Sequence, residues 1–180
     1  MAEIKGFHPV KLICGMISSK DEFFRRAEER LVKFFGSVDT RSQHFAFDCT
    51  DYYELQMGKE LKRGFVSFER LIAPERLSAI KVQTNILEDD IKREFEVSFR
   101  IVNLDPGYIT QAALIMATAK DFSHRVPLQH GIYAHLEFLF RKNGIRKLDW
   151  TYPDFLKEGY QKYFLEVRKN YLRQLKAKTK

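Results

Sequence analysis

The 180-residue sequence predicts an α+β fold, a ferredoxin-like βαββαβ antiparallel sheet extended by a C-terminal β-hairpin and a long basic helix. Two observations predict it. Apolar residues alternate with period two in some segments and recur every three or four residues in others, and these segments follow the order βαββαβ. No linker, repeat or low-complexity stretch divides the chain, so we expect one domain over residues 1–180.

The first half of the chain supplies three strands and a helix. Leu12–Ser18 is almost entirely apolar, which is typical of a strand buried on both faces. A helix is expected to begin at Ser19–Glu22, which has the form of a capping box, and to end at Gly36. Alternating apolar residues around Phe45–Phe47 and a β-prone run over Gly64–Ile72 predict the next two strands.

The second half of the βαββαβ pattern follows directly. Pro74 opens a second helix, whose apolar residues recur at helical spacing over Leu77–Ile91. Alternation over Phe95–Ile101 predicts a strand, and Asn103–Gly107 then predicts a type II turn with proline and glycine at its centre. Ala112–Ala119 is apolar enough for either a strand or a short helix, and its length does not decide between them.

The C-terminal part predicts a hairpin and a basic helix. Gly131–Lys142 alternates, Asn143-Gly144 favours a tight turn, and Ile145–Thr151 returns as a strand. A final helix is expected to start at Pro153 and Asp154. Residues 141–180 carry twelve basic and four acidic residues, whereas the whole chain has a net charge of +7. The basic character therefore belongs to this segment, and an electrostatic argument about partners concerns this segment alone.

Several common function classes are excluded by the absence of their motifs. Gly58-Lys59 lacks the flanking residues of a P-loop, and Lys120-Asp121 lacks the preceding asparagine of a guanine-specificity motif. The sequence has no GxGxxG, HExxH or GxSxG pattern, which argues against dinucleotide binding, zinc proteolysis and serine hydrolysis by the usual routes.

The location is expected to be cytoplasmic, without membrane attachment. Cys14 and Cys49 have no CxxC spacing, which favours two reduced thiols over a disulfide framework. The apolar run Leu12–Ile17 is interrupted by Gly15 and is too short for a signal segment or a membrane span.

Two polar clusters are candidates for a site. In the first, Asn103, Asp105 and Tyr108 place an amide, a carboxylate and a phenol around the expected turn, although such residues are also ordinary turn formers. In the second, Lys120 to Arg125 combines two cations, a carboxylate, a hydroxyl and an imidazole in six positions. Lysine and arginine there can bind an anion while the histidine moves a proton, and the alternative is a solvated loop with local ion pairs.

Weaker candidates lie elsewhere. Tyr133, His135 and Glu137 share one face of a strand, which is more often the wet side of a sheet than a metal site, so we expect no metal. Lys81, Asn85 and Glu88 share one helical stripe, which is either solvated or lines a cleft. Aromatic residues over 48–53 and 150–154 form either a stacking platform or helix-to-sheet packing, and packing is the more common outcome.

At these positions the chain resembles an uncharacterised family of bacteria and archaea, domain of unknown function 4416, whose hallmark is the same Asn-Leu-Asp-Pro-Gly-Tyr run. The resemblance extends over nearly the whole chain, through Asp48, Asp51–Tyr53, Met57–Gly58, Lys62–Arg63, Ser67–Glu69, Lys81, Thr84–Asn85, Glu88, Asn103–Tyr108, Lys120–Asp121, Ser123–Arg125, Gly131–Ala134 and Trp150–Asp154. Phe122 and His135 depart from the family pattern, which more often has Tyr and Glu there, so we place no catalysis on either. The resemblance implies no activity, cofactor or substrate.

These observations lead to two functional hypotheses. The first is a pocket protein or enzyme for a small anionic or phosphorylated ligand, with His124 as acid or base and Asp105 as its carboxylate partner. The alternative is an RNA-binding module that uses the sheet and the basic C-terminal helix, and a merely solvated helix is the default reading of that segment. No cofactor is identified. For the first hypothesis we assign catalysis to His124, Asp105 and Asp121, and ligand binding to Asn103, Tyr108, Lys120, Arg125, Lys81 and Asn85.

Overall fold

The computed structural model describes residues 3–178 and has a mixed α/β architecture. Its strands are β1 (Val10–Ser18), β2 (Val38–Arg41), β3 (Phe45–Ala46), β4 (Lys62–Ile72), β5 (Asn103–Ile109), β6 (Ala113–Thr118), β7 (Val126–Pro127), β8 (Tyr133–Arg141) and β9 (Gly144–Lys147). Its helices are α1 (Asp21–Phe35), α2 (Glu54–Met57), α3 (Leu77–Glu94) and α4 (Glu158–Lys178), with single 3₁₀ turns η1 (Pro74–Arg76) and η2 (Pro153–Leu156).

All nine strands form one antiparallel sheet in the described part of the chain. The order along the sheet is β2-β4-β1-β5-β6-β8-β7, with β3 added to β4 and β9 added to β8. Strand β1 lies between β4 and β5 and pairs with both. The expected antiparallel sheet and the α+β class are therefore confirmed.

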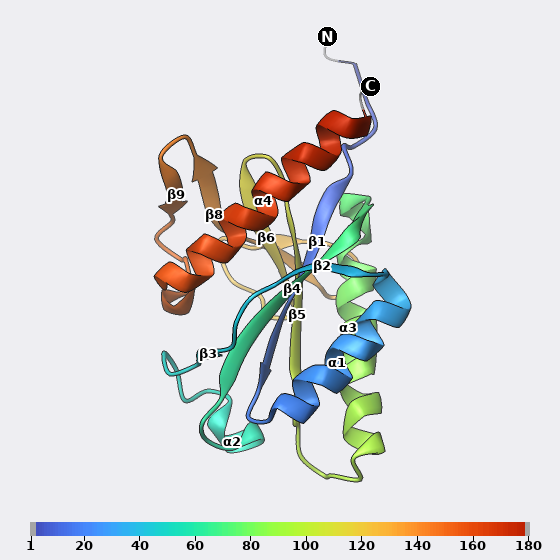
Figure 1. Cartoon of the computed structure of the whole chain (residues 1–180), viewed down its shortest axis with the longest axis vertical. Helices are drawn as coiled ribbons and strands as arrows, with labels where there is room; N and C mark the ends of the chain where they lie inside the picture. The colour runs from blue at the N-terminus through green and yellow to red at the C-terminus, as the bar shows by residue number, and fades with distance from the viewer. Residues whose placement is uncertain (1–2, 179–180) are drawn as a thin grey trace.

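Helices cover both faces of this sheet (Figure 1). On one face, Leu12, Cys14 and Met16 of β1 pack in a core with residues of α1 and α3. On the other face, Ile13 of β1 packs in a second core with aromatic residues of α4, such as Phe164. Successive residues of β1 thus pack in the cores on opposite faces of the sheet, which explains why its sequence is almost continuously apolar.

Most predicted elements are confirmed, and the undecided segment is a strand. Residues Ala113–Thr118 form β6, the Asn143-Gly144 turn joins β8 to β9, and the last helix follows Pro153. The first helix begins at Asp21 after Lys20, but no side chain caps it, so the predicted capping box is wrong. The strand expected around Phe45–Phe47 is only two residues long, and β2 and β7 were not predicted.

The strand predicted over Phe95–Ile101 is wrong, because helix α3 ends there in a Schellman motif. Glu96 has a positive φ of 52°, the N–H of Val97 donates to the carbonyl of Lys92 at 3.3 Å, and the N–H of Glu96 donates to that of Arg93 at 3.1 Å. Phe95 and Val97 then pack against the core as loop residues. Their burial produces the alternating pattern that imitates a strand.

The predicted type II turn at Asn103–Gly107 is also wrong, because these residues form the start of β5. Pro106 pairs with Cys14 of β1, and pairing with β6 begins only at Gly107, so the missing proline N–H falls outside the β6 ladder. A Cβ atom on Gly107 would lie 2.6 Å from the carbonyl oxygen of Ile115. The Pro-Gly pair therefore reflects close packing of strands and not a reversal of the chain.

Helix α4 packs its apolar stripe on the sheet and leaves its basic residues outside. Tyr160, Phe164 and Val167 are buried, whereas Lys169 and Arg173 are exposed. Among the described residues no helix has the length and apolarity needed to cross a membrane.

Candidate functional site

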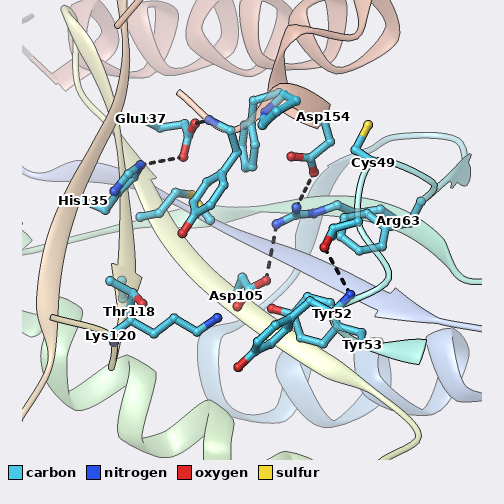
Figure 2. A pocket seen from close by; sticks show the side chains of 17 residues that line it. Cys49, Tyr52, Tyr53, Arg63, Asp105, Thr118, Lys120, His135, Glu137 and Asp154 are labelled. Atoms are coloured by element: carbon cyan, nitrogen blue, oxygen red, sulfur yellow. Dashed lines mark hydrogen bonds and ion pairs between the residues drawn. The ribbon is translucent and has the colours of Figure 1, made fainter. Parts of the chain in front are cut away.

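A pocket of about 300 Å³ opens where β5 and β6 separate (Figure 2). The two strands pair only over Gly107–Ile109 and Leu114–Met116, and their continuations toward Asp105 and Thr118 line the pocket instead. Residues of the segments 47–53 and 152–155 line its other sides. The lining residues are Phe47, Cys49, Thr50, Tyr52, Tyr53, Arg63, Asp105, Met116, Ala117, Thr118, Lys120, His135, Glu137, Tyr152, Pro153, Asp154 and Phe155.

A buried arginine joins two carboxylates in the pocket. Arg63 of β4 donates from Nη1 to Asp154 Oδ2 at 2.5 Å and from Nη2 to Asp105 Oδ2 at 3.3 Å (Figure 2). Its guanidinium also lies over the ring of Phe155, 4.8 Å from the centroid. Burial lowers the pKa of Arg63, but the two carboxylates outweigh this and the pKa is raised. Arg63 therefore stays charged and fixes both acids.

Asp105 lies beside three donor side chains. Besides Arg63, it accepts a hydrogen bond from Asn103 Nδ2 at 2.6 Å, and Lys81 Nζ lies 3.5 Å from its Oδ1. Lys81 comes from α3 and also donates to the carbonyl of Leu104 at 2.7 Å. Burial raises the pKa of Asp105, but the charges of Lys81 and Arg63 and the Asn103 hydrogen bond outweigh it and lower the pKa below 3.8. Asp105 is thus an ionised group in the pocket wall.

An unpaired lysine lies at the opening of the pocket. Lys120, just after β6, is exposed, and its Nζ lies 3.7 Å from the centroid of the Tyr52 ring. Within residues 3–178 no carboxylate lies within ion-pair distance of this nitrogen. Figure 2 shows the side chain reaching across the opening toward the tyrosines.

The loop after Lys120 is tied to the pocket wall by Arg125. Its Nη1 donates to the carbonyl of Lys120 at 2.8 Å and its Nη2 to the Tyr152 hydroxyl at 2.6 Å. His124 stacks on Trp150 with centroids 4.7 Å apart, and its Nε2 lies 3.1 Å from His135 Nδ1. Desolvation and the neighbouring His135 and Arg125 lower the pKa of His124, which favours the neutral imidazole.

His135 and Glu137 of β8 lie inside the wall, which corrects the expectation of a wet strand face. Only 1% of His135 and none of Glu137 is exposed. His135 Nε2 lies 3.0 Å from Glu137 Oε2, and Glu137 Oε1 accepts a hydrogen bond from the Tyr152 N–H at 2.8 Å. Burial raises the pKa of Glu137 despite the opposing influence of His135. The same pocket therefore holds one carboxylate with a lowered pKa and one with a raised pKa.

The predicted site residues fall into three groups. Asp105 and Lys120 line the pocket. Lys81 and Asn103 contact Asp105, while His124 and Arg125 contact residues of the wall.

The remaining three residues of the prediction lie away from the pocket lining. Asp121 and Asn85 are exposed, and Tyr108 packs against the cores beside α3. His124 also has a partner other than the expected one, because its ring contacts His135 and the donors to Asp105 are Asn103, Arg63 and Lys81.

Four charged or imidazole residues of the pocket lining were not among the assigned site residues: Arg63, His135, Glu137 and Asp154. Arg63 lies near the start of β4, directly before its apolar run, and Asp154 belongs to the 150–154 segment, for which the sequence left packing and ligand stacking open. The His135 and Glu137 alternation was visible, but only their burial distinguishes a pocket wall from a solvated face. The tyrosines at 52, 53 and 152 belong to aromatic segments that left packing and ligand stacking open.

The acids and imidazoles of this site do not form a metal cluster. Among the described residues there is no group of three or more His, Cys, Asp or Glu placed to hold a metal ion. The carboxylates of Asp105 and Asp154 instead pair with the cations Arg63 and Lys81.

Comparison with known proteins identifies a family but no characterised relative. No curated protein and no solved structure gives a significant match to the chain. The family model described as a domain of unknown function, DUF4416, matches residues 8–171. This match includes every lining residue of the pocket and all nine strands of the described sheet. The chain therefore belongs to the DUF4416 family.

Proposed function

We propose that this protein binds a small anionic or phosphorylated ligand in the pocket between β5 and β6. The observation that carries the proposal is Lys120, a cation at the opening with an aromatic contact and no carboxylate partner among the described residues. Two other cations lie near the pocket, Lys81 and Arg63, and both already form ion pairs with Asp105. Among the described lining residues, Lys120 is therefore the cation that is available to an incoming anion, and it lies at the opening of the pocket.

The rest of the lining supports a ligand with a flat or apolar body. Tyr52, Tyr53 and Tyr152 line the pocket together with Phe47 and Phe155. Aromatic rings offer large contact area and stack on planar groups. A volume of about 300 Å³ is at the small end of ligand pockets, which favours a metabolite-sized molecule over a polymer.

A thermal-shift screen tests this proposal. The probes are inorganic phosphate, nucleoside monophosphates and sugar phosphates, each added to the full chain. A probe at about one hundred times its Kd stabilises the protein by about 2.7 kcal/mol, which raises the Tm by roughly 5–10 °C for a chain of this size. We expect Lys120→Ala to remove most of that increase and to leave the unliganded Tm nearly unchanged, because Lys120 is exposed.

Lys142→Ala is the matched control, since Lys142 is an exposed lysine in the hairpin between β8 and β9. It should keep the full ligand-induced shift. The proposal is wrong if no probe shifts the wild-type Tm, or if Lys120→Ala and Lys142→Ala respond equally to the active probe.

The RNA-binding alternative is less well supported. The aromatic residues Phe65 and Phe138 of the sheet are buried under α4, and α1 and α3 cover the other face, so a sheet platform is not exposed. Only the outer side of α4 remains for this role. Binding there should weaken steeply with salt and fall when Arg168, Lys169 and Arg173 are neutralised; salt-insensitive binding, or none at low salt, excludes it.

We also infer that β1, α1, β2, β4, α3 and β5 form a ferredoxin-like unit, within one domain. The order β2-β4-β1-β5 and the antiparallel pairing support the first inference. A single sheet that includes β6 to β9 supports the second. Two free thiols, Cys14 and Cys49, support a cytoplasmic location, which cell fractionation tests.

A further inference from the structure

Three side chains form a line from the pocket wall to the protein surface. Glu137 and His135 line the pocket and are buried, and His124 is half-buried in the loop outside them. Glu137 Oε2 and His135 Nε2 are 3.0 Å apart, and His135 Nδ1 and His124 Nε2 are 3.1 Å apart. Each separation is within reach of a proton transfer between neighbouring groups.

Arg125 fixes the direction of this line. Its Nε lies 3.4 Å from His135 Nδ1 and can only donate a hydrogen bond, so Nδ1 is an acceptor. The neutral His135 ring then carries its hydrogen on Nε2, which faces Glu137. His124 Nε2 faces the same acceptor and must also carry a hydrogen. The guanidinium itself keeps its protons, so the path to the surface runs through His124.

At the inner end of this line of side chains, His135 contacts Glu137 inside the pocket wall. His135 Nε2 and Glu137 Oε2 are buried and lie 3.0 Å apart, but among the described residues they are not aligned as a hydrogen bond. Transfer of the Nε2 proton therefore requires a small rotation of the ring or the carboxylate, as is common for catalytic groups in an unliganded protein. A buried carboxyl group beside a buried imidazole is an arrangement suited to acid–base chemistry near neutral pH. Tyr152 contacts both residues, since its N–H bonds Glu137 and its ring stacks on His135.

We propose that Glu137, His135 and His124 form a proton relay between solvent and the pocket, which lets the pocket perform acid–base chemistry on its anionic ligand. This gives His135 a role that the sequence comparison with the family did not predict. In the inward direction His124 takes a proton from water on Nδ1 and passes its Nε2 proton to His135 Nδ1. His135 in turn passes its Nε2 proton to the Glu137 carboxylate. One proton enters, the Glu137 carboxyl group gains it, and both imidazoles are left protonated on Nδ1. The reverse sequence returns the proton to solvent and restores the Nε2-protonated tautomer of both rings.

The charges around the pocket are consistent with this division of roles. Asp105 is held ionised by Lys81 and Arg63, whereas burial raises the pKa of Glu137. Two carboxyl groups whose environments move their pKa values apart are a common arrangement for acid–base catalysis. The catalytic meaning of the relay rests on the proposed ligand site, but the relay itself is a property of the free protein.

Nuclear magnetic resonance of the unliganded full chain with nitrogen-15 histidine tests the relay. In the wild type, the nitrogen shifts of His135 should report the neutral tautomer protonated on Nε2. The Nδ1-protonated tautomer would overturn the proposal, because the line of donors would then be broken. This measurement needs no variant and does not depend on finding a ligand.

The second measurement is the exchange rate of the His135 Nε2–H proton with water. His124→Phe keeps a ring for Trp150 to stack on and removes the relay nitrogen. We expect this variant to slow exchange by at least about tenfold, a modest share of the effect of a positioned acid or base. His8→Phe, at an exposed histidine outside the line, is the control and should leave the rate unchanged.

Equal exchange rates in the wild type and in His124→Phe would refute the relay, and so would an equal slowing in His8→Phe. The ligand proposal is tested separately by Lys120→Ala, whose side chain is not part of the relay. A failed relay with a normal ligand-induced Tm shift leaves a binding pocket without this chemistry. An intact relay without any ligand-induced shift removes the proposed ligand instead.

Discussion

Gly107 illustrates how one residue determines the shape of the pocket. It is the first residue of β5 that pairs with β6, directly after Pro106, which lies outside that ladder. A Cβ atom at this position would lie 2.5 Å from Met116 Sδ and 2.6 Å from the carbonyl oxygen of Ile115. The flexible methionine can move, but the backbone oxygen cannot do so without shifting β6. Glycine is therefore needed where the strands approach before they separate around the pocket.

We predict that Gly107→Ala destabilises the protein by about 1–3 kcal/mol, as overpacking of a close strand contact does. Urea unfolding measures the change in the free energy of unfolding. Gly6→Ala is the control, because no atom lies within 4 Å of a Cβ built at Gly6, and it should change stability by less than about 0.5 kcal/mol. Similar values for the two variants would contradict the packing explanation.

Arg63 shows a limit of reading residues one at a time. A charged residue at the start of a strand is normally an exposed residue, and nothing in its sequence neighbourhood indicates two carboxylate partners. Those partners, Asp105 and Asp154, are separated from it by 42 and 91 positions. Only the folded sheet brings Arg63, Asp105 and Asp154 together, so the burial of Arg63 could not be predicted from the sequence.

At the scale of elements, the end of helix α3 combines a common motif with an uncommon residue. The two hydrogen bonds of the Schellman motif place Glu96 in the left-handed region that glycine adopts without strain. Glu96 is exposed, and its carboxylate has no ion pair among the described residues. We therefore predict that Glu96→Gly stabilises the protein by about 1 kcal/mol, because relief of the backbone strain exceeds the added entropy of the unfolded chain.

Thermal or urea unfolding measures this gain. Asp89→Gly is the matched control at an exposed position inside the same helix, where glycine should lower stability. A loss of stability in both variants would show that the positive φ of Glu96 carries no strain worth relieving.

The same helix end explains which elements could be predicted from the sequence. Strands β1 and β4, helices α1 and α3 and the hairpin of β8 and β9 were predictable, because each has a continuous or periodic apolar pattern. The structure of Phe95–Gly107 could not be predicted, because the left-handed position at the end of α3 is a glutamate and not the usual glycine. In addition, Pro106 and Gly107 lie within a strand and not in a turn. Both exceptions are caused by tertiary packing, which overrides local residue preference.

At the scale of the whole molecule, the candidate site could be predicted only in part. The segments around Asp105 and Lys120 were identified, because dense polar residues next to apolar runs are visible in the sequence. The opposite wall, with Glu137 and Asp154, comes from β8 and the segment before α4, and its contribution depends on the strand order. Polarity in the sequence thus located the segments of Asp105 and Lys120, whereas the other charged residues of the site are brought together only by the strand order.

The ion pairs around Asp105 connect most layers of the molecule. Lys81 belongs to α3 on one face of the sheet, Arg63 belongs to β4, and Asp154 belongs to the turn that precedes α4. Asp105 therefore contributes to stability only while it is ionised. Its folded-state pKa is lowered below the ordinary value of 3.8, because its two cations outweigh the effect of burial. The contribution is complete above the ordinary pKa and is lost as the pH falls through the folded-state value.

We predict that Asp105→Asn lowers the free energy of unfolding at pH 7 by about 1–3 kcal/mol, the usual range for hydrogen bonds to a charged group. The difference from wild type should shrink as the pH falls below 3.8, because protonation of Asp105 removes the same charge. Urea unfolding at a series of pH values measures this difference. Asp121→Asn is the control, since Asp121 is exposed, and it should match wild type at every pH. A constant difference for Asp105→Asn would mean that lost packing, and not lost charge, weakens the molecule.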